Sequence, residues 1–273
     1  MHSTGRFLAR VLGVEAAENG RALHAQLRAA AASGKDEAPP RVVLDVTGAT
    51  ADTVLDHVTQ MYNAAAAVSI ATQVNVLLQV RRGSGGGGDA ASTEGGEVPL
   101  EPLRAADLTP ELGYELFDHV AMGGTFDRLH VGHKVLLTYS VLHTRHRLRI
   151  GVTGEELLKK KQHAELLQPF AVRRHNVEQF VRSLRDDLVY DVVELTEPSG
   201  GTTTIPDVSG MVVSPETLPS VEAINVQRVA NGLAPVKPVL INYIGPHGSE
   251  RVSSTALREA EKTGSDADAD PAE

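Results

Sequence analysis

The chain has 273 residues, of which 41% are hydrophobic and 22% charged, and its formal net charge is −9. This acidic balance argues against a surface that coats nucleic acid, so we expect no nucleic-acid partner. No apolar run approaches the ~18 residues that a membrane span needs, so no membrane association is expected either. The sequence contains no cysteine, which excludes disulfides, thiolate metal ligands and thiol nucleophiles and fits a cytoplasmic location.

The first part of the chain predicts a small α/β region. An alanine-rich helix is expected over residues 5–32 and a strand over residues 41–46. Residues 53–67 repeat apolar side chains at helical spacing, and residues 74–80 form a second apolar strand. A β–α–β order of this kind predicts parallel strands, so residues 1–110 are interpreted as an N-terminal α/β region.

Two segments have compositions that cannot build a core. Residues 83–97 are rich in Gly and Ser and predict a flexible linker. This glycine cluster lacks the Gly-Lys-Ser/Thr ending of a phosphate-binding loop, which disfavours that alternative. Residues 263–273 are acidic and predict a disordered tail. With a boundary near residues 100–115, we expect residues 1–110 to be separable from the rest of the chain.

Strands and helices alternate in the second part of the chain, residues 115–262. Strands are predicted over residues 117–122, 147–152, 188–194, 210–213 and 238–244, and helices over 131–143, 154–161, 169–184, 215–231 (broken near Pro219) and 253–262. This alternation predicts an α/β fold with a Rossmann-like parallel sheet covered on both faces. Such sheets bind ligands at the carboxyl ends of their strands.

A glycine-rich turn with two histidines follows the strand over residues 117–122. It carries a hydroxyl at Thr125 and imidazoles at His130 and His133, and a helix begins within it. Helix N-termini attract phosphate through free N–H groups, so the pattern predicts chemistry on a phosphate. The alternatives are solvated surface histidines and a zinc site. Zinc would need Asp127 as a third ligand, and we predict no protein-bound metal.

Three other segments could face the same crevice. They are the lysine run 159–161, the pair Asn225 and Arg228 on one helical face, and residues 251–258. In the last segment, Ser253, Ser254 and Thr255 open a helix, and Arg258 lies about one turn further on. Taken singly, a lysine run is usually a solvated helix face and a serine cluster an N-cap. Their common place at the ends of one sheet favours a shared phosphate site.

Two of these segments resemble signatures of the nucleotidyltransferase superfamily. Thr125 with 130–133 (His-Val-Gly-His) is similar to its T/HxGH motif, and residues 252–258 to its ISSTxxR-type motif. His130 stands where bacterial phosphopantetheine enzymes carry Thr, and Val252 replaces the usual Ile. Within the superfamily, the sequence is similar to eukaryotic and archaeal phosphopantetheine adenylyltransferases in residues 123–130, 156–161, 168–173, 212–217 and 223–225.

The resemblance, which covers about residues 117–262, implies a reaction and a site. ATP would donate its adenylyl group to 4′-phosphopantetheine, giving dephospho-CoA and pyrophosphate in coenzyme A biosynthesis, with Mg²⁺ bound mainly through ATP. His133 would stabilise the transition state, with His130 and Lys161 (or Lys159) beside it. The implied catalytic residues are His133, His130 and Lys161, and the implied ATP- or substrate-binding residues are Gly123, Gly124, Thr125, Phe126, Gly132, Lys159, Ser214, Asn225, Arg228, Ser253, Ser254, Thr255 and Arg258.

Two alternatives stay open at the level of sequence. One is another adenylyl- or cytidylyltransferase of the same superfamily, and the other is a catalytically silent nucleotide-binding scaffold. Residues 56–81 faintly resemble the leading region of bifunctional coenzyme A synthase. No kinase phosphate-loop signature occurs in the sequence, so a monofunctional enzyme is expected. The patterns assign neither an oligomeric state nor a role for the loop 197–207.

Overall fold

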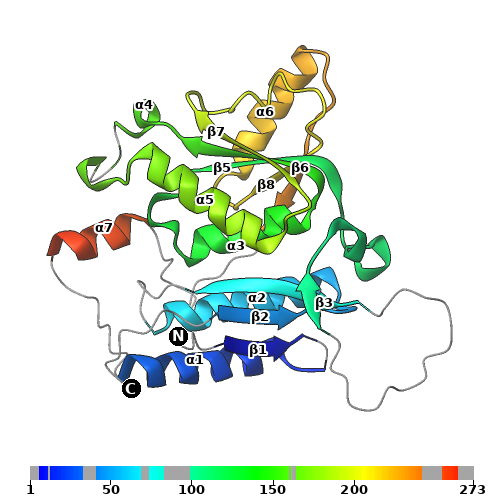
Figure 1. Cartoon of the computed structure of the whole chain (residues 1–273). Coiled ribbons are helices and arrows are strands. Elements are labelled where there is room, and N and C mark those ends of the chain that lie inside the picture. The colour runs from blue at the N-terminus through cyan, green and yellow to red at the C-terminus, as the bar shows by residue number, and fades with distance from the viewer. Residues whose placement is uncertain are drawn as a thin grey trace.

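A computed structural model of the chain describes residues 6–11, 13–32, 41–68, 74–82, 99–159, 161, 164–241 and 254–263. It contains a four-stranded sheet in the order β1-β2-β3-β4 and a five-stranded sheet in the order β7-β6-β5-β8-β9. Figure 1 shows the two sheets as separate layers with helices between and around them. The predicted α/β fold is therefore confirmed.

The first sheet is built by the N-terminal part of the chain. Its elements are β1 (Arg6–Arg10), α1 (Ala16–Ala32), β2 (Arg41–Asp45), α2 (Ala51–Ala66), β3 (Asn75–Arg81) and β4 (Leu100–Pro102). The first three strands are parallel, and β4, which was not predicted, runs antiparallel to β3. The linker predicted over residues 83–97 lies outside the described residues.

The helix predicted over residues 5–32 is wrong in its first part. Residues 6–10 form β1, which pairs in register with β2, and the helix begins only at Ala16. Gly13 between them has φ 77°, a left-handed conformation that no α-helix can run through. Long-range strand pairing here overrides the helix preference of an alanine-rich segment.

The second sheet is fully parallel over its described strands. Its elements are β5 (Phe117–Gly124), α3 (Val131–Leu142), β6 (Thr144–Thr153), α4 (Glu155–Leu158), α5 (Phe170–Leu184), β7 (Val189–Leu195), β8 (Gly210–Val213), α6 (Leu218–Ala230), β9 (Lys237–Leu240) and α7 (Ser254–Thr263). The predicted helix 154–161 is shorter than expected. Pro219 does not break a helix, because it lies in the first turn of α6, where a missing N–H costs little. Residues 242–244 of the last predicted strand fall outside the described residues, as do residues 264–273 of the predicted tail.

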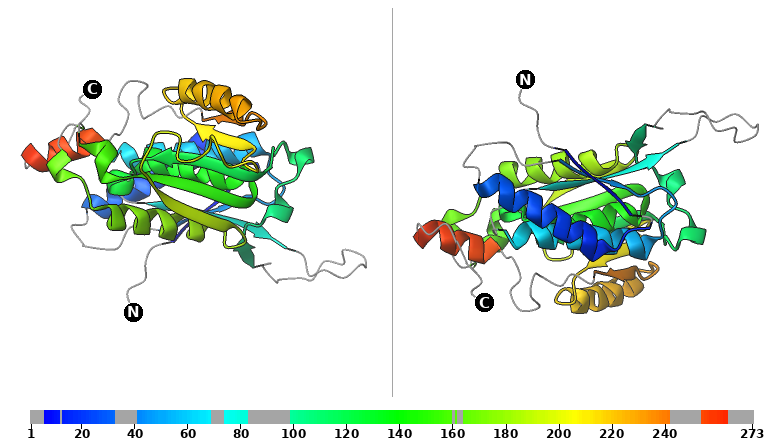
Figure 2. Two further views of the ribbon diagram at one scale, coloured as in Figure 1. Left: turned by 90° about the horizontal axis from the view of Figure 1, so that it is seen from above. Right: turned by 90° about the horizontal axis from the view of Figure 1, so that it is seen from below.

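Helices α3 and α5 lie between the two sheets, and α6 lies on the other side of the five-stranded sheet (Figures 1 and 2). Helix α2 packs against α3, and β3 packs against α5. One continuous cluster of buried side chains therefore includes residues of both sheets, among them Met61 and Tyr62 of α2 and Leu137 and Val141 of α3. The two parts of the chain share a core.

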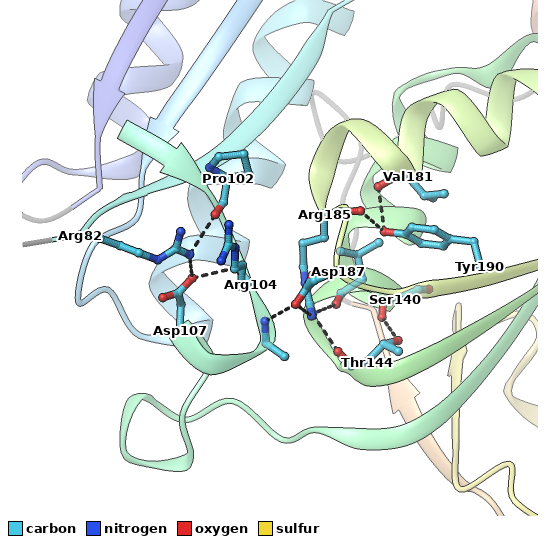
Figure 3. Close-up of polar contacts among 12 residues, drawn as sticks. Arg82, Pro102, Arg104, Asp107, Ser140, Thr144, Val181, Arg185, Asp187 and Tyr190 are labelled. Carbon is cyan, nitrogen blue, oxygen red and sulfur yellow. Dashed lines mark hydrogen bonds and ion pairs between the residues drawn. The ribbon is translucent and has the colours of Figure 1, made fainter. Parts of the chain in front are cut away.

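Polar contacts reinforce this junction. The Lys134 ammonium in α3 donates to the Val74 carbonyl at 2.7 Å. The Ala105 N–H donates to the Asp187 carboxylate, which also holds the fully buried Arg185 after α5 (Figure 3). Among the helices described, none is both long and apolar enough to span a membrane.

Candidate active site

The end of β5 turns sharply into α3. A side chain at Gly124 would place its Cβ 3.1 Å from the Phe126 ring, so the glycine allows that ring to pack against the strand end. Phe126 and Arg128 have φ of 54° and 48°, a left-handed conformation that is uncommon for side chains other than glycine. Backbone strain of this kind clusters at functional sites. The turn brings Thr125 and the first residues of α3 to the carboxyl edge of the sheet.

The two histidines of this turn lie against each other. His130 is the N-cap residue of α3, and its carbonyl accepts a hydrogen bond from the Lys134 N–H at 3.0 Å. The His130 and His133 rings stack with centroids 3.8 Å apart, and the Phe126 ring lies 5.2 Å from that of His133. Within the described part of the chain, the buried Nδ1 atom of neither histidine has a hydrogen-bond partner. Gly132 lies between them in the first turn of α3, where free backbone N–H groups face outward.

Both imidazoles are held neutral. Burial lowers the pKa of His130 to about 4. The negative charge of Asp127 raises this pKa, and the positive charge of Lys134 lowers it, so neither reverses the effect of burial. Burial, His130 and Lys161 together keep the pKa of His133 well below its usual range. At pH 7 each ring can donate a hydrogen bond to a phosphate without carrying a charge of its own.

We expect this burial to make the fold sensitive to acid. The unfolded chain protonates His130 near its ordinary pKa of about 6.5, whereas the folded chain does so only near pH 4. The unfolded state therefore binds more protons below pH 6.5, and stability is lost as pH falls through this window. For His130 alone, the loss between pH 7 and pH 5 is about 2 kcal/mol. Urea unfolding at both pH values measures it.

His130→Gln should remove this part of the pH dependence, and His146→Gln, at a side chain that is 71% exposed, should leave it unchanged. Equal stability of the unsubstituted protein at pH 7 and pH 5 would contradict the neutral, buried His130.

The lysine beside the turn is Lys161. Its ammonium donates to the Thr125 hydroxyl at 2.7 Å. Lys159 is exposed and pairs with Glu156, and Lys160 lies outside the described residues. The pKa of Lys161 is lowered, first by partial loss of hydration and then by the nearby positive charge of Arg258. The structure thus places Lys161, and not Lys159, at the turn between β5 and α3.

Arg173, in the first turn of α5, belongs to the same cluster although sequence reasoning did not assign it to the site. It is fully buried, and one guanidinium nitrogen donates to the carbonyls of Thr125 and Thr153, each at 2.8 Å. Its Nε donates to the Gln168 carbonyl. Arg173 therefore joins the carboxyl ends of β5 and β6. The only signal in the sequence was its place at the end of the phrase 168–173.

The start of α7 lies against the turn. The Ser254 hydroxyl donates to the Asp127 carbonyl at 3.0 Å, and Arg258 donates to the Asp127 carboxylate at 2.7 Å. The Thr255 hydroxyl accepts from Arg258. Two segments that are 131 positions apart therefore meet at one point. Arg258 and Asp127 are both fully buried. The Arg258 side chain is therefore not accessible for the direct contact with phosphate that the sequence predicted. Ser253 lies outside the described residues.

Two predicted residues are not brought to the turn. Asn225 uses its side-chain amide to bond both the carbonyl and the N–H of Val236. Arg228 is fully buried and holds the loop 197–207 and its neighbours through five carbonyl oxygens, those of Thr202, Ile205, Pro206, Val208 and Ala234. Since these bonds occupy every donor of the guanidinium, the structure contradicts the phosphate-binding role predicted for Arg228.

The other predicted residues lie along the carboxyl edge. Gly123 is exposed at the end of β5, and Ser214 directly follows β8, the parallel neighbour of β5. The Ser214 hydroxyl lies 3.2 Å from that of Thr217. Among the residues described, no group of three His, Asp or Glu side chains is arranged to hold a metal ion. Cations, hydroxyls and helix N–H groups, with no cysteine nucleophile in the sequence, suit the positioning and stabilisation of phosphates.

No protein-family model matches the chain. A phosphopantetheine adenylyltransferase from Saccharomyces cerevisiae is 38% identical over 146 residues, which are 52% of this chain and 48% of the yeast protein. Those from Pyrococcus abyssi and Methanothermobacter thermautotrophicus are 32% and 35% identical over 142 residues, 52% of this chain and 89% and 84% of the archaeal proteins. A solved Archaeoglobus fulgidus protein of unknown function matches with 32% identity and a TM-score of 0.42, over 49% of this chain and 94% of that one.

The chain thus spans about half the length of the yeast relative. It spans most of the archaeal ones, with roughly a third of the aligned residues identical. By this coverage and identity, the chain belongs to the phosphopantetheine adenylyltransferase family.

Proposed function

We propose that the protein transfers the adenylyl group of ATP to 4′-phosphopantetheine, giving dephospho-CoA and pyrophosphate in coenzyme A biosynthesis. The observation that carries the proposal is the convergence of His130, His133, Thr125 and Lys161 at the N-terminus of α3. The names of its relatives supply the substrates. The absence of cysteine fits the reducing cytoplasm as the place of this reaction.

The reaction needs no covalent enzyme intermediate. A phosphate oxygen of the acceptor forms a bond to the α-phosphorus of ATP, and the bond from that phosphorus to the bridging oxygen of the β-phosphate breaks. The electron pair leaves with pyrophosphate. His133 donates a hydrogen bond to the α-phosphate as its charge shifts, and Lys161, held by Thr125, attracts the phosphates of both substrates.

The start of α7 would hold the β- and γ-phosphates. Its first backbone N–H groups and the Thr255 hydroxyl supply donors, while the Ser254 hydroxyl, which donates to the Asp127 carbonyl, anchors the start of the helix. Arg258 is buried and does not touch the phosphates itself, but it places a positive charge next to the Thr255 hydroxyl, to which it donates a hydrogen bond. Mg²⁺ bound to the triphosphate would neutralise the leaving pyrophosphate. The buried Asp127 cannot serve as its ligand in this arrangement, because Arg258, Arg128 and the Gln168 N–H occupy it.

The test is pyrophosphate release from ATP or CTP with three acceptors in turn: 4′-phosphopantetheine, nicotinamide mononucleotide and phosphocholine. We expect release only with ATP and 4′-phosphopantetheine, together with a product of the mass of dephospho-CoA. Activity with CTP but not ATP, or with another acceptor, would assign the site to a different nucleotidyltransferase. No turnover with any pair would point to a nucleotide-binding scaffold.

The two lysines that the structure separates make a matched pair. Lys161→Gln should lower kcat/KM by about 10–100-fold, because a hydrogen bond to a charged group is worth about 1.5–3 kcal/mol. Lys159→Gln, at an exposed side chain paired with Glu156, should change kcat/KM by less than about twofold. Steady-state kinetics with both substrates varied measures each. The reverse ranking would show that Lys159 serves the site.

A further inference from the structure

One buried carboxylate joins the parts of the site. Oδ1 of Asp127 accepts from the Gln168 N–H at 2.9 Å. Oδ2 accepts from Arg258 at 2.7 Å and from Arg128 at 2.9 Å. The Asp127 carbonyl accepts from the Ser254 hydroxyl. The Asp127 side chain therefore connects three segments: the turn after β5, the segment before α5 and the start of α7.

Asp127 cannot touch a substrate in this arrangement. Its side chain is fully buried, and donors from the adjacent Arg128 and from the distant Gln168 and Arg258 surround the carboxylate. The negative charge of Asp127 is also needed at this position, as the counter-charge of buried arginines. Arg258 and Arg173 are fully buried nearby, and a buried cation without a counter-charge is strongly unfavourable.

We propose that Asp127 is a positioning residue that holds the start of α7 against the turn between β5 and α3. Through Arg258 and Ser254 it sets the place of the α7 N–H groups and hydroxyls relative to His133 and Lys161. This inference rests on the proposed function for its consequence in catalysis, because α7 then supplies the contacts to the β- and γ-phosphates of ATP.

The chain contains a matched control. Asp187 also pairs with a fully buried arginine, Arg185, which bonds the carbonyls of Val141 and Thr144 (Figure 3). This pair lies beyond the end of α5, at the amino end of β6, whereas the turn is at the carboxyl end of the parallel strands. Asp187→Asn therefore reports what the loss of a structural ion pair does on its own.

The first measurement is hydrogen exchange of the full-length protein without substrate. In Asp127→Asn we expect the amides of residues 254–263 to exchange roughly 10-fold faster or more, because a buried ion pair is broken. Asp187→Asn should leave exchange in this segment at the unsubstituted rate. Exchange of α7 unchanged by Asp127→Asn would overturn the inference. Since no substrate is used, this result is independent of the proposed function.

The second measurement is kinetic. Asp127→Asn should raise KM for ATP roughly 10-fold or more and leave KM for 4′-phosphopantetheine within about twofold. In an Arg258→Gln background it should add less than about twofold, since the two residues act as a unit. Fully additive effects, or an equal rise of both KM values, would overturn the role. Failure of the unsubstituted protein to turn over would instead sink the proposed function.

Should Asp127→Asn not fold, Arg258→Lys and Arg258→Gln test the same contact from the other side. Lysine keeps the charge beside Asp127, so exchange in residues 254–263 should be faster in Arg258→Gln than in Arg258→Lys. Equal exchange in both variants and in the unsubstituted protein would overturn the inference.

Discussion

Replacing His133 with alanine should lower kcat by about 10²–10³-fold, the usual cost of losing one donor to a developing negative charge. The imidazole is neutral, stacked on His130 and fixed by the Phe126 ring, so it is already oriented before ATP binds. A contact that strengthens mainly in the transition state affects turnover more than ground-state binding. KM for ATP should therefore change by only a few-fold. Steady-state rates of pyrophosphate release measure both constants.

His146→Ala is the control, because its side chain is 71% exposed and pairs only weakly with Asp118 at 3.8 Å. Its kinetic constants should equal those of the unsubstituted protein. If His133→Ala lowers ATP affinity as much as it lowers kcat, His133 binds ATP uniformly and does not act on the transition state. The proposed role would then pass to Lys161 or His130.

The sequence predicted the second sheet and the turn because their signals are local. Apolar runs separated by helical repeats mark parallel strands, and their register puts residues after each strand at one edge. The turn after β5 and the start of α7 carry motifs whose residue types match their chemistry. Lys161 could be ranked above Lys159 only by the resemblance, and the structure now gives the reason in its bond to Thr125.

The features that sequence reasoning missed depend on long-range partners. Arg173 and Arg228 look alike in a sequence, yet one bonds strand-end carbonyls beside the site and the other bonds loop carbonyls elsewhere. Backbone carbonyls carry no sequence signal. Asp127 was weighed only as a zinc ligand, because its arginine partner lies 131 positions away. Strand β1 is visible only through its pairing with β2.

The same kind of contact decides what the N-terminal region does. We expect a protein that begins at residue 99 to be insoluble or unfolded, against the separable units that the sequence suggested. Deletion would uncover the face of α3 that packs on α2, including the buried Thr138, which lies beside Tyr62, and the buried Tyr139, which lies beside Thr59. It would also remove the carbonyl that accepts from Lys134, a side chain only 4% exposed and adjacent to His133. Gel filtration and circular dichroism measure the outcome.

Point substitutions separate this packing from a trivial failure of the shortened chain. Tyr62 is fully buried, and its hydroxyl accepts from the Val76 N–H at 3.2 Å. Tyr62→Ala should cost about 3–5 kcal/mol of unfolding free energy. Tyr62→Phe, which loses only the hydroxyl, should cost about 1 kcal/mol. Val226→Ala, at a side chain 71% exposed on α6, should cost less than about 0.5 kcal/mol.

If the junction is one core, Tyr62→Ala lowers the single unfolding transition of both sheets together, because α2 and α3 cannot separate without exposing each other. Two transitions, of which only the earlier one shifts, would mean that the five-stranded sheet holds α3 by itself. In that case the shortened chain should fold and keep its kcat, and the N-terminal region would have no part in placing His133. The number of transitions therefore decides between a shared core and a separable region even if the shortened chain never becomes soluble.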